Sequence, residues 1–166
     1  MDFSNKVVII TGASSGIGAG AAEYFSSLGA KLVLTGRNEA NLEATVGKCS
    51  GEVLPLVADV NVEADRENII SETVKKFGRI DVLVNNAGIG EVLGDILSTS
   101  MTQFDNVMNT NVRSIFHLTQ LATPYLIKTK GNIVNISSVA GLRSFAGFTV
   151  YCMSKGKNKA SLRRSF

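Results

Sequence analysis

The sequence contains little cysteine and little proline, and each scarcity excludes a class of protein. Its 2 cysteines, Cys49 and Cys152, are too few and too far apart for a disulfide framework or a zinc knuckle. We therefore expect two reduced thiols and no metal site. With only 2 prolines and 45% apolar residues, the chain fits neither a disordered nor a collagen-like protein.

The sequence also lacks segments that direct a chain into a membrane or out of the cell. No apolar run approaches the ~20 residues that a membrane helix needs. Residues 1–6 do not show the basic and then apolar pattern of a signal peptide. We therefore expect a cytoplasmic protein with no membrane partner. Since a typical domain has ~150 residues, residues 1–166 should form one domain.

Acidic residues are missing from the last third of the chain. All 14 of them lie at or before Asp105, whereas residues 106–166 carry nine Lys or Arg. Five of those nine fall in the last twelve residues. A basic end can bind nucleic acid, but no aromatic residues are interleaved with these charges. We expect residues 156–166 to be a poorly ordered, solvated tail, and no nucleic-acid partner.

Short apolar runs alternate with helical patterns along the chain. Continuous apolar strands are typical of a parallel sheet covered by helices on both faces. The pattern therefore predicts an α/β protein with a doubly wound parallel sheet, the Rossmann fold. The expected strands are Lys6–Thr11, Lys31–Thr35, Val53–Ala58, Ile80–Asn85 and Asn132–Ile136. The expected helices are Gly18–Leu28, Glu39–Lys48, Val62–Phe77 and about Thr102 to Ile127, where Pro124 should bend or shorten the last turn.

A glycine-rich segment, TGASSGIG, joins the first strand to the first helix. Gly12 allows a tight turn, Gly16 lets the backbone approach a pyrophosphate, and Gly18 lets the helix pack closely. The N-terminus of the helix offers free N–H groups to an anion. A purely structural turn is the alternative. The position between a strand and a helix favours a dinucleotide site.

The spacing T-G-x-x-x-G-x-G is one of five features that occur in the order of a known family. Asn85-Asn86-Ala87-Gly88 follows the fourth strand, Ser138 ends the fifth, and Tyr151 and Lys155 form Y-x-x-x-K thirteen residues later. Asn111 lies in the long helix. Over residues 6–155 the chain resembles the short-chain dehydrogenase/reductase family, including its 3-oxoacyl-acyl-carrier-protein reductases. The resemblance implies an oxidoreductase that transfers a hydride between a nicotinamide cofactor and a small-molecule carbonyl or alcohol, with homo-oligomeric full-length relatives.

The resemblance also implies a role for each catalytic position. Tyr151 would be the general acid/base, and the Lys155 cation one helical turn away would favour its phenolate form. Ser138 would hydrogen-bond the substrate oxygen, whereas the neighbouring Ser137 would face the other side of the strand. Asn111 would hold a water in a proton relay, with a satisfied buried amide as the alternative. His117 lies in an apolar stretch and is expected to be a packed residue.

Arg37 follows the second strand, where NAD-preferring members carry an acidic residue. An arginine there can bind a 2′-phosphate through charge-assisted hydrogen bonds, so NADP is the expected cofactor and NAD the second choice. The alternative for Arg37 is a surface arginine near a turn. The alternative to a cofactor contact for Asn85 is a role in stabilising the central strand. The expected cofactor contacts are Thr11, Gly12, Ser14, Ser15, Gly16, Ile17, Gly18, Arg37, Asn38, Asp59, Val60, Asn85, Ala87, Gly88, Tyr151 and Lys155.

The chain is short for the family that it resembles. Members usually run to about 250 residues in one domain, whereas this sequence ends eleven residues after Lys155. We therefore expect a form truncated after the fifth strand and the start of the active-site helix. The fifth strand would then be an exposed apolar edge. A catalytically impaired, dinucleotide-binding form of such an enzyme is the alternative function.

Overall fold

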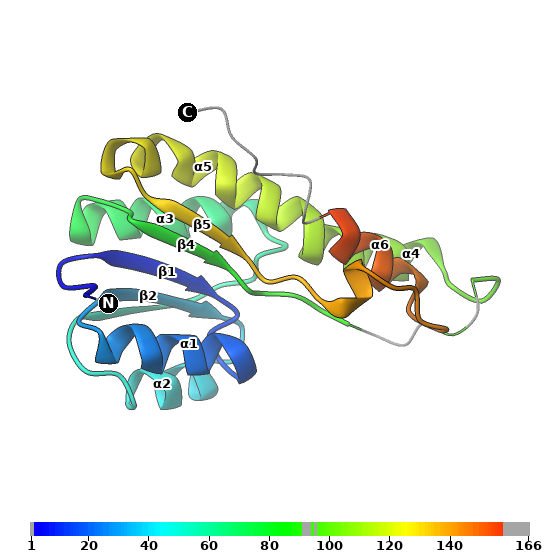
Figure 1. Cartoon of the computed structure of the whole chain (residues 1–166), viewed down its shortest axis with the longest axis horizontal. Coiled ribbons are helices and arrows are strands. Elements are labelled where there is room, and N and C mark those ends of the chain that lie inside the picture. The colour runs from blue at the N-terminus through cyan, green and yellow to red at the C-terminus, as the bar shows by residue number, and fades with distance from the viewer. Residues whose placement is uncertain (1, 91–93, 95, 158–166) are drawn as a thin grey trace.

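A five-stranded parallel sheet lies at the centre of the computed structural model, which describes residues 2–90, 94 and 96–157 (Figure 1). The strand order is β3-β2-β1-β4-β5, and all neighbouring pairs are parallel. The order reverses beside β1, which is the arrangement of a doubly wound sheet. The predicted fold class is therefore confirmed. The strands are β1 (Val7–Thr11), β2 (Lys31–Gly36), β3 (Val53–Val57), β4 (Val82–Asn85) and β5 (Asn132–Asn135).

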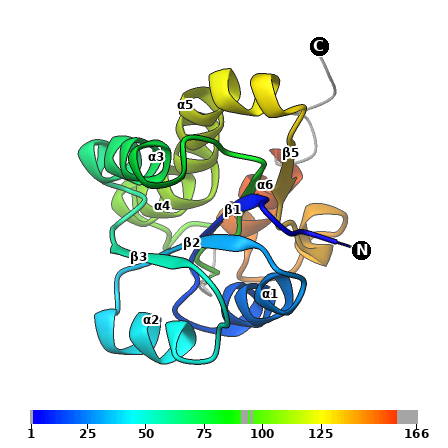
Figure 2. The same ribbon diagram turned by 90° about the vertical axis from the view of Figure 1, so that its left-hand side faces the viewer.

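Helices cover both faces of the sheet (Figure 2). On one face lie α1 (Gly16–Ser27) and α2 (Glu39–Val46), and on the other lie α3 (Glu63–Phe77) and α5 (Ser114–Thr129). Side chains of β1 alternate between the two cores, because successive strand residues point to opposite faces. Val8 and Ile10 pack toward α1 and α2, and Ile9 packs toward α3 and α5.

The two edge strands are less buried than the sequence pattern predicts. All residues of β1 and β4 are buried, whereas Val57 in β3 is 55% exposed and Val134 in β5 is 41% exposed. The expectation of burial on both faces is wrong for these edges, because each has a neighbouring strand on one side only. Pro55 lies in β3, as expected for an edge strand that can spare a backbone donor.

The long predicted helix is interrupted by a turn of π-helix. Helix α4 (Met101–Met108) runs into the π-helical η1 (Asn109–Arg113), and α5 then continues to Thr129. Pro124 does not end α5, so the expected shortening there is wrong. Ala122 and Leu126 are buried against the sheet on either side of Pro124, and this packing outweighs the local cost of proline.

The described part of the chain ends in a short 3-10 helix and a last α-helix, η2 (Val139–Gly141) and α6 (Thr149–Lys157). Helix α6 includes Gly156 and Lys157, which were expected to belong to the poorly ordered tail. Gly141 packs against the Lys155 carbonyl, which helps to fix this turn. The rest of the tail, residues 158–166, lies outside the described residues. Within the described ranges, no helix is long and apolar enough to span a membrane.

Candidate active site

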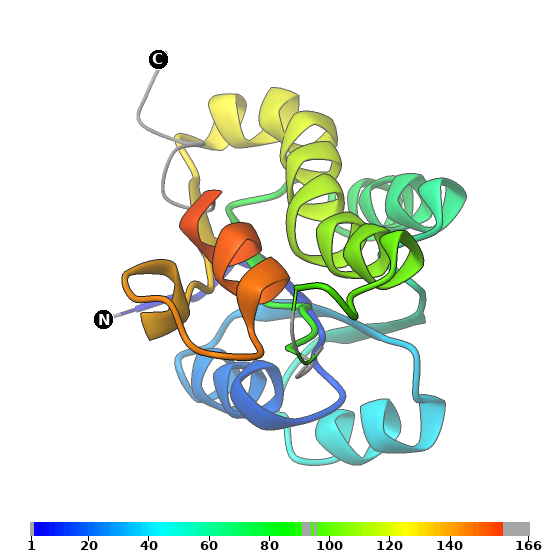
Figure 3. The ribbon, with the colours of Figure 1, turned by 90° about the vertical axis from the view of Figure 1, so that its right-hand side faces the viewer.

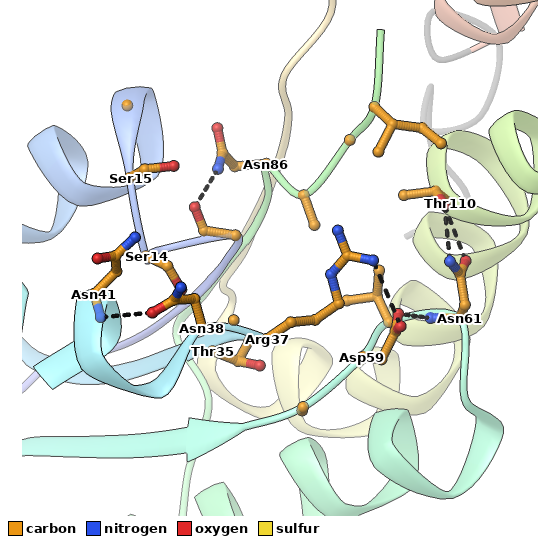
Figure 4. A pocket seen from close by; sticks show the side chains of 18 of the residues that line it. Ser14, Ser15, Thr35, Arg37, Asn38, Asn41, Asp59, Asn61, Asn86 and Thr110 are labelled. Carbon is orange, nitrogen blue, oxygen red and sulfur yellow. Dashed lines mark hydrogen bonds and ion pairs between the residues drawn. The ribbon is translucent and has the colours of Figure 1, made fainter. Parts of the chain in front are cut away.

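A cleft of about 450 Å³ lies at the carboxyl ends of the strands (Figure 4). Segments that follow β1, β2, β3 and β4 all contribute to its lining. This is the edge at which ligands bind in doubly wound sheets. Eleven of the predicted cofactor contacts line the cleft: Gly12, Ser14, Ser15, Gly16, Ile17, Arg37, Asn38, Asp59, Val60, Ala87 and Gly88.

The glycine-rich loop has the backbone conformation that its sequence predicts. Gly12 and Gly16 have φ angles of +66° and +56°, in the left-handed region that favours glycine. A Cβ atom on Gly18 would overlap the carbonyl oxygen of Gly12, whereas one on Gly16 would meet nothing within 4 Å. Gly18 therefore permits close packing of α1 on the loop. Gly16 leaves open space in the cleft.

The first turn of α1 presents unused hydrogen-bond donors to the cleft. Ser15 is the N-cap residue, and its side chain makes no capping hydrogen bond. The hydroxyl of Ser14 is buried against Gly36 and has no hydrogen-bond partner among the described residues. Free N–H groups at a helix N-terminus and an unpaired hydroxyl are the groups that a phosphate oxygen can satisfy.

Asn86, which was not among the expected cofactor contacts, fixes this loop from the end of β4. Its Nδ2 donates to the carbonyl oxygens of Thr11 (2.9 Å) and Gly12 (3.1 Å). The hydroxyl of Thr11 in turn accepts from the N–H groups of Asn86 (3.1 Å) and Ala87 (3.0 Å). Thr11 is buried below the cleft and does not line it, so it supports the site from beneath.

Asn85 does not line the cleft either, contrary to the expected cofactor contact. Its Nδ2 donates to the Asn135 side chain at 2.9 Å, which links the ends of β4 and β5. The residue is buried, so the structure favours the alternative role, stabilisation of the central strand. Because successive residues at the end of a strand point in opposite directions, only Asn86 of the two asparagines faces the loop.

Arg37 and Asp59 face each other at the β2–β3 end of the cleft (Figure 4). The Arg37 Nη1 atom lies 3.8 Å from Asp59 Oδ2, and the Arg37 side chain is 69% exposed. The pair is therefore long and open to solvent, and it leaves most guanidinium donors unused. The side-chain oxygen of Asn38, Oδ1, accepts a hydrogen bond from the Asn41 N–H at 2.8 Å and so caps α2. Asn41, Asn61 and Thr110 also line the cleft and were missed from the sequence.

Tyr151 and Lys155 lie one turn apart on α6. This helix packs against η2 on one side and against α4 and η1 on the other (Figure 3). The Lys155 Nζ atom is 5.7 Å from the centroid of the Tyr151 ring and donates to the Ile136 carbonyl oxygen at 2.9 Å. Lys155 is only 4% exposed, and this burial lowers the pKa of its ammonium group. The Tyr151 ring contacts Gly90 and lies edge-on to Phe148.

Ser138 is half-buried at the start of η2, where its hydroxyl accepts the Ala140 N–H at 3.1 Å. A Cβ atom on Gly141 would lie 2.8 Å from the Lys155 carbonyl oxygen, so η2 and α6 are in direct contact. The fold thus holds η2, which Ser138 caps, against the helix of Tyr151 and Lys155. Ser137 has a different environment, since its hydroxyl donates to the Lys155 carbonyl at 3.4 Å.

Asn111 occupies the π-helical turn and is fully buried. Its side chain exchanges two hydrogen bonds with the backbone of Ile89, at 2.9 and 2.8 Å, and donates to the Ser154 hydroxyl at 3.0 Å. A Cβ atom on Gly88 would lie 3.2 Å from Asn111 Oδ1 and 3.4 Å from Lys155 Nζ. Asn111 is thus a satisfied buried amide that also lies next to the active-site lysine.

The hydrogen bond of His117 joins α5 to α3, away from Tyr151 and Lys155 on α6. His117 lies on α5, and its Nδ1 accepts a hydrogen bond from Arg66 Nε on α3 at 2.9 Å. The histidine is half-buried between the two helices. This placement agrees with a packed residue.

Known proteins of similar sequence include dehydrogenases and reductases. A sequence profile described as short chain dehydrogenase matches residues 6–161. The chain is 40% identical over 157 residues to meso-2,3-butanediol dehydrogenase of Serratia marcescens, covering 94% of this chain and 62% of that protein. It is 39% identical over 161 residues to a 3-oxoacyl-[acyl-carrier-protein] reductase of Thermotoga maritima, covering 93% and 64%. The chain thus spans less than two thirds of the length of these relatives.

Solved structures of similar fold include proteins described as short-chain dehydrogenases/reductases. A short-chain dehydrogenase/reductase of Burkholderia phymatum in complex with NAD superposes with a TM-score of 0.91 at 33% identity, over 96% of this chain and 58% of that one. A Caenorhabditis elegans protein of the same family, solved with cofactor, gives a TM-score of 0.87 at 35% identity, over 95% and 62%.

Proposed function

Because the chain belongs to the short-chain dehydrogenase family, we propose that it transfers a hydride between NADP(H) and the carbonyl or alcohol carbon of a small molecule. One observation carries the proposal: residues that line the cleft adjoin the tyrosine–lysine pair, although neither Tyr151 nor Lys155 lines the cleft itself. Gly88 and Ile89 line the cleft, and both contact Asn111, which lies beside Lys155. The next glycine, Gly90, lies against the Tyr151 ring.

The residues present fit a dinucleotide. The first turn of α1 and the unpaired Ser14 hydroxyl would hold the pyrophosphate. Asp59 and Val60 would flank the adenosine, and Ala87 and Gly88 would contact the nicotinamide half near Lys155. Thr11 and Gly18 would act indirectly, by supporting the loop.

Arg37 supports a preference for NADP(H), with NAD(H) as the second choice. Its guanidinium group is mostly exposed, and its ion pair with Asp59 is long enough for a stronger partner to replace it. A 2′-phosphate is such a partner, since it can accept two charge-assisted hydrogen bonds from one arginine.

Within the site, each catalytic side chain has a distinct proposed task. The bound nicotinamide ring would supply or accept the hydride. Tyr151 would give a proton to the substrate oxygen during reduction, or take it during oxidation. Ser138 would donate a hydrogen bond to the same oxygen. Lys155 would hold positive charge next to the Tyr151 ring, and Asn111 would anchor residue 89 and adjoin the lysine.

A binding and turnover experiment tests the proposal. The chain should bind NADPH in a fluorescence titration and consume it when a panel of small carbonyl compounds is added. Binding without turnover would favour the alternative, a dinucleotide-binding form that is catalytically impaired. Absence of binding to both NADPH and NADH would contradict the proposal. The cytoplasmic location stays a prediction, which fractionation can test, and light scattering can determine the oligomeric state.

A further inference from the structure

The loop that follows β3 is held in place by side chains from two other elements. This loop, residues 58–61, lines the cleft beside Arg37. At the start of α3, Asp65 Oδ2 accepts the Asp59 N–H at 2.8 Å, and Arg66 Nη1 donates to the Val60 carbonyl at 2.6 Å. On the π-helical turn, Thr110 shares a hydrogen bond of 2.9 Å with the side chain of Asn61. Three consecutive residues of the loop, Asp59, Val60 and Asn61, therefore each have a partner on another element.

Arg66 is the unusual member of this set, because it is a charged side chain that is only 4% exposed. Within the described residues, no carboxylate forms an ion pair with it. Burial of an unpaired guanidinium group is costly, and an apolar side chain would fill the same space at less cost. The hydrogen bonds that Arg66 makes are therefore the property that distinguishes it from a packing residue.

His117 fixes the other side of the Arg66 guanidinium group. Its Nδ1 accepts from Arg66 Nε at 2.9 Å, so the arginine is held between a ring on α5 and a carbonyl of the loop. Carboxylate oxygens of Glu63 and Glu67 lie within 4.8 Å of a His117 ring nitrogen. The result is a continuous chain of contacts from α5 through α3 to Val60.

We propose that Arg66, oriented by His117, is a positioning residue for the adenosine half of the nucleotide cleft. The inference rests on the proposed cofactor function. The loop follows β3, at the opposite edge of the sheet from β5, whereas Tyr151 and Lys155 pack beyond β4 and β5. The Arg66 contact therefore lies on the adenosine side of the cleft, and we expect its loss to affect mainly the adenosine end.

Separate binding of the two halves of the cofactor tests this inference. We expect Arg66→Met to weaken the binding of 5′-AMP about tenfold, since a charge-assisted hydrogen bond to the loop is lost. The affinity for nicotinamide mononucleotide should stay within about twofold of wild type. Arg66→Lys, which can still donate to Val60, should recover part of the loss. The control is Lys75→Met, which removes an exposed cation from the same helix and should change neither affinity.

A merely structural role would give a different pattern, with both affinities falling together as the fold loosens. Unchanged binding of 5′-AMP in a folded Arg66→Met variant would overturn the inference. If that variant does not fold, His117→Leu decides, because it removes only the partner of Arg66. In His117→Leu the binding of 5′-AMP should weaken about threefold, and the binding of nicotinamide mononucleotide should not change. Unchanged binding of 5′-AMP in His117→Leu would overturn the inference. Failure of the wild-type chain to bind 5′-AMP, NADPH and NADH would instead overturn the proposed cofactor site itself.

Discussion

At the scale of single residues, Lys155 combines deep burial with a positive charge. The ammonium group has a carbonyl oxygen and a phenol ring as neighbours, and no ion pair with a carboxylate among the residues that the structure describes. Burial therefore lowers the pKa of Lys155. A charge held at this energetic cost next to Tyr151 is consistent with a role in proton transfer, since a cation favours the phenolate.

The lowered pKa of Lys155 has a consequence for stability. Between the pKa of Lys155 in the folded state and that in the unfolded state, the unfolded chain binds the extra proton, so the free energy of unfolding rises with pH in this window. Urea unfolding from about pH 7 to about pH 10 should therefore show wild type gaining stability relative to Lys155→Met as pH increases. For Lys75→Met, at an exposed position, the free energy of unfolding should change with pH in parallel with that of wild type. Parallel curves for both variants would contradict the buried cation.

Tyr151 is expected to transfer the proton. Tyr151→Phe keeps the ring that packs against Gly90 and Phe148 but removes the hydroxyl. Steady-state turnover of NADPH with a carbonyl substrate should fall by ~10²–10⁴, the usual contribution of general acid/base catalysis. Tyr24→Phe, on the exposed side of α1, should leave turnover unchanged. Wild-type turnover in Tyr151→Phe would mean that another group supplies the proton.

Arg37 is expected to distinguish the two cofactors. Arg37→Ala should weaken NADPH binding by about 1.5–3 kcal/mol, the range for hydrogen bonds to charged groups, and should spare NADH. Fluorescence titrations of both cofactors measure the difference. Lys75→Ala serves as the control for loss of one surface charge. Equal losses for NADPH and NADH would show that Arg37 does not contact a 2′-phosphate.

At the scale of elements, two glycines of α1 have opposite roles. A Cβ atom on Gly18 would overlap the Gly12 carbonyl, whereas one on Gly20 would meet nothing within 4 Å. Gly18→Ala should therefore lower the free energy of unfolding by about 1–3 kcal/mol and weaken NADPH binding, because α1 must move off the loop. Gly20→Ala should raise the free energy of unfolding by up to about 1 kcal/mol, since alanine is the better helix former. Chemical denaturation compares the two; similar effects would contradict this difference in packing.

Local patterns predicted most elements and the sites that depend on backbone geometry. The strand–glycine loop–helix unit was predictable because glycine at fixed spacing has few structural explanations, and Gly12, Gly16 and Gly18 lie as expected. The inner strands were predictable from their apolar runs. The π-helical turn at Asn109–Arg113 was not, because no apolar period marks one extra residue in a turn.

Side-chain direction was the part that the sequence could not fix. In Asn85-Asn86 the two residues are chemically identical, and only the tertiary structure shows that Asn86 holds the loop while Asn85 bonds Asn135. Gly156 has a low helix propensity, yet it lies in α6, where η2 packs against the preceding residue. Arg66 could not be connected to Val60 and His117, because these contacts join three separate elements.

At the scale of the whole molecule, the two ends of the sheet have different tasks. The carboxyl ends hold the cleft, and the amino ends are fixed by Asp81, which is 3% exposed. Its carboxylate accepts the Val7 N–H at 2.9 Å and two hydrogen bonds from Arg79, and Lys6 lies 3.4 Å away. Burial alone would raise the pKa of Asp81, but the hydrogen bonds from Arg79 and Val7 and the two nearby cations hold it below its usual value.

This separation predicts that stability and cofactor binding can be changed independently. Asp81→Ala leaves the Val7 N–H unpaired at the start of β1, so it should lower the free energy of unfolding by about 2–3 kcal/mol. In the wild-type protein, the stabilisation that the ionised Asp81 carboxylate provides should be lost below about pH 4, as the pH falls through the lowered pKa of Asp81. Saturation with NADPH at about 100 times its Kd should add about 2.7 kcal/mol to wild type and to the variant alike, because distant sites act additively. Denaturation with and without NADPH gives both quantities, and a smaller increment in Asp81→Ala would show that the amino ends of the strands are coupled to the cleft.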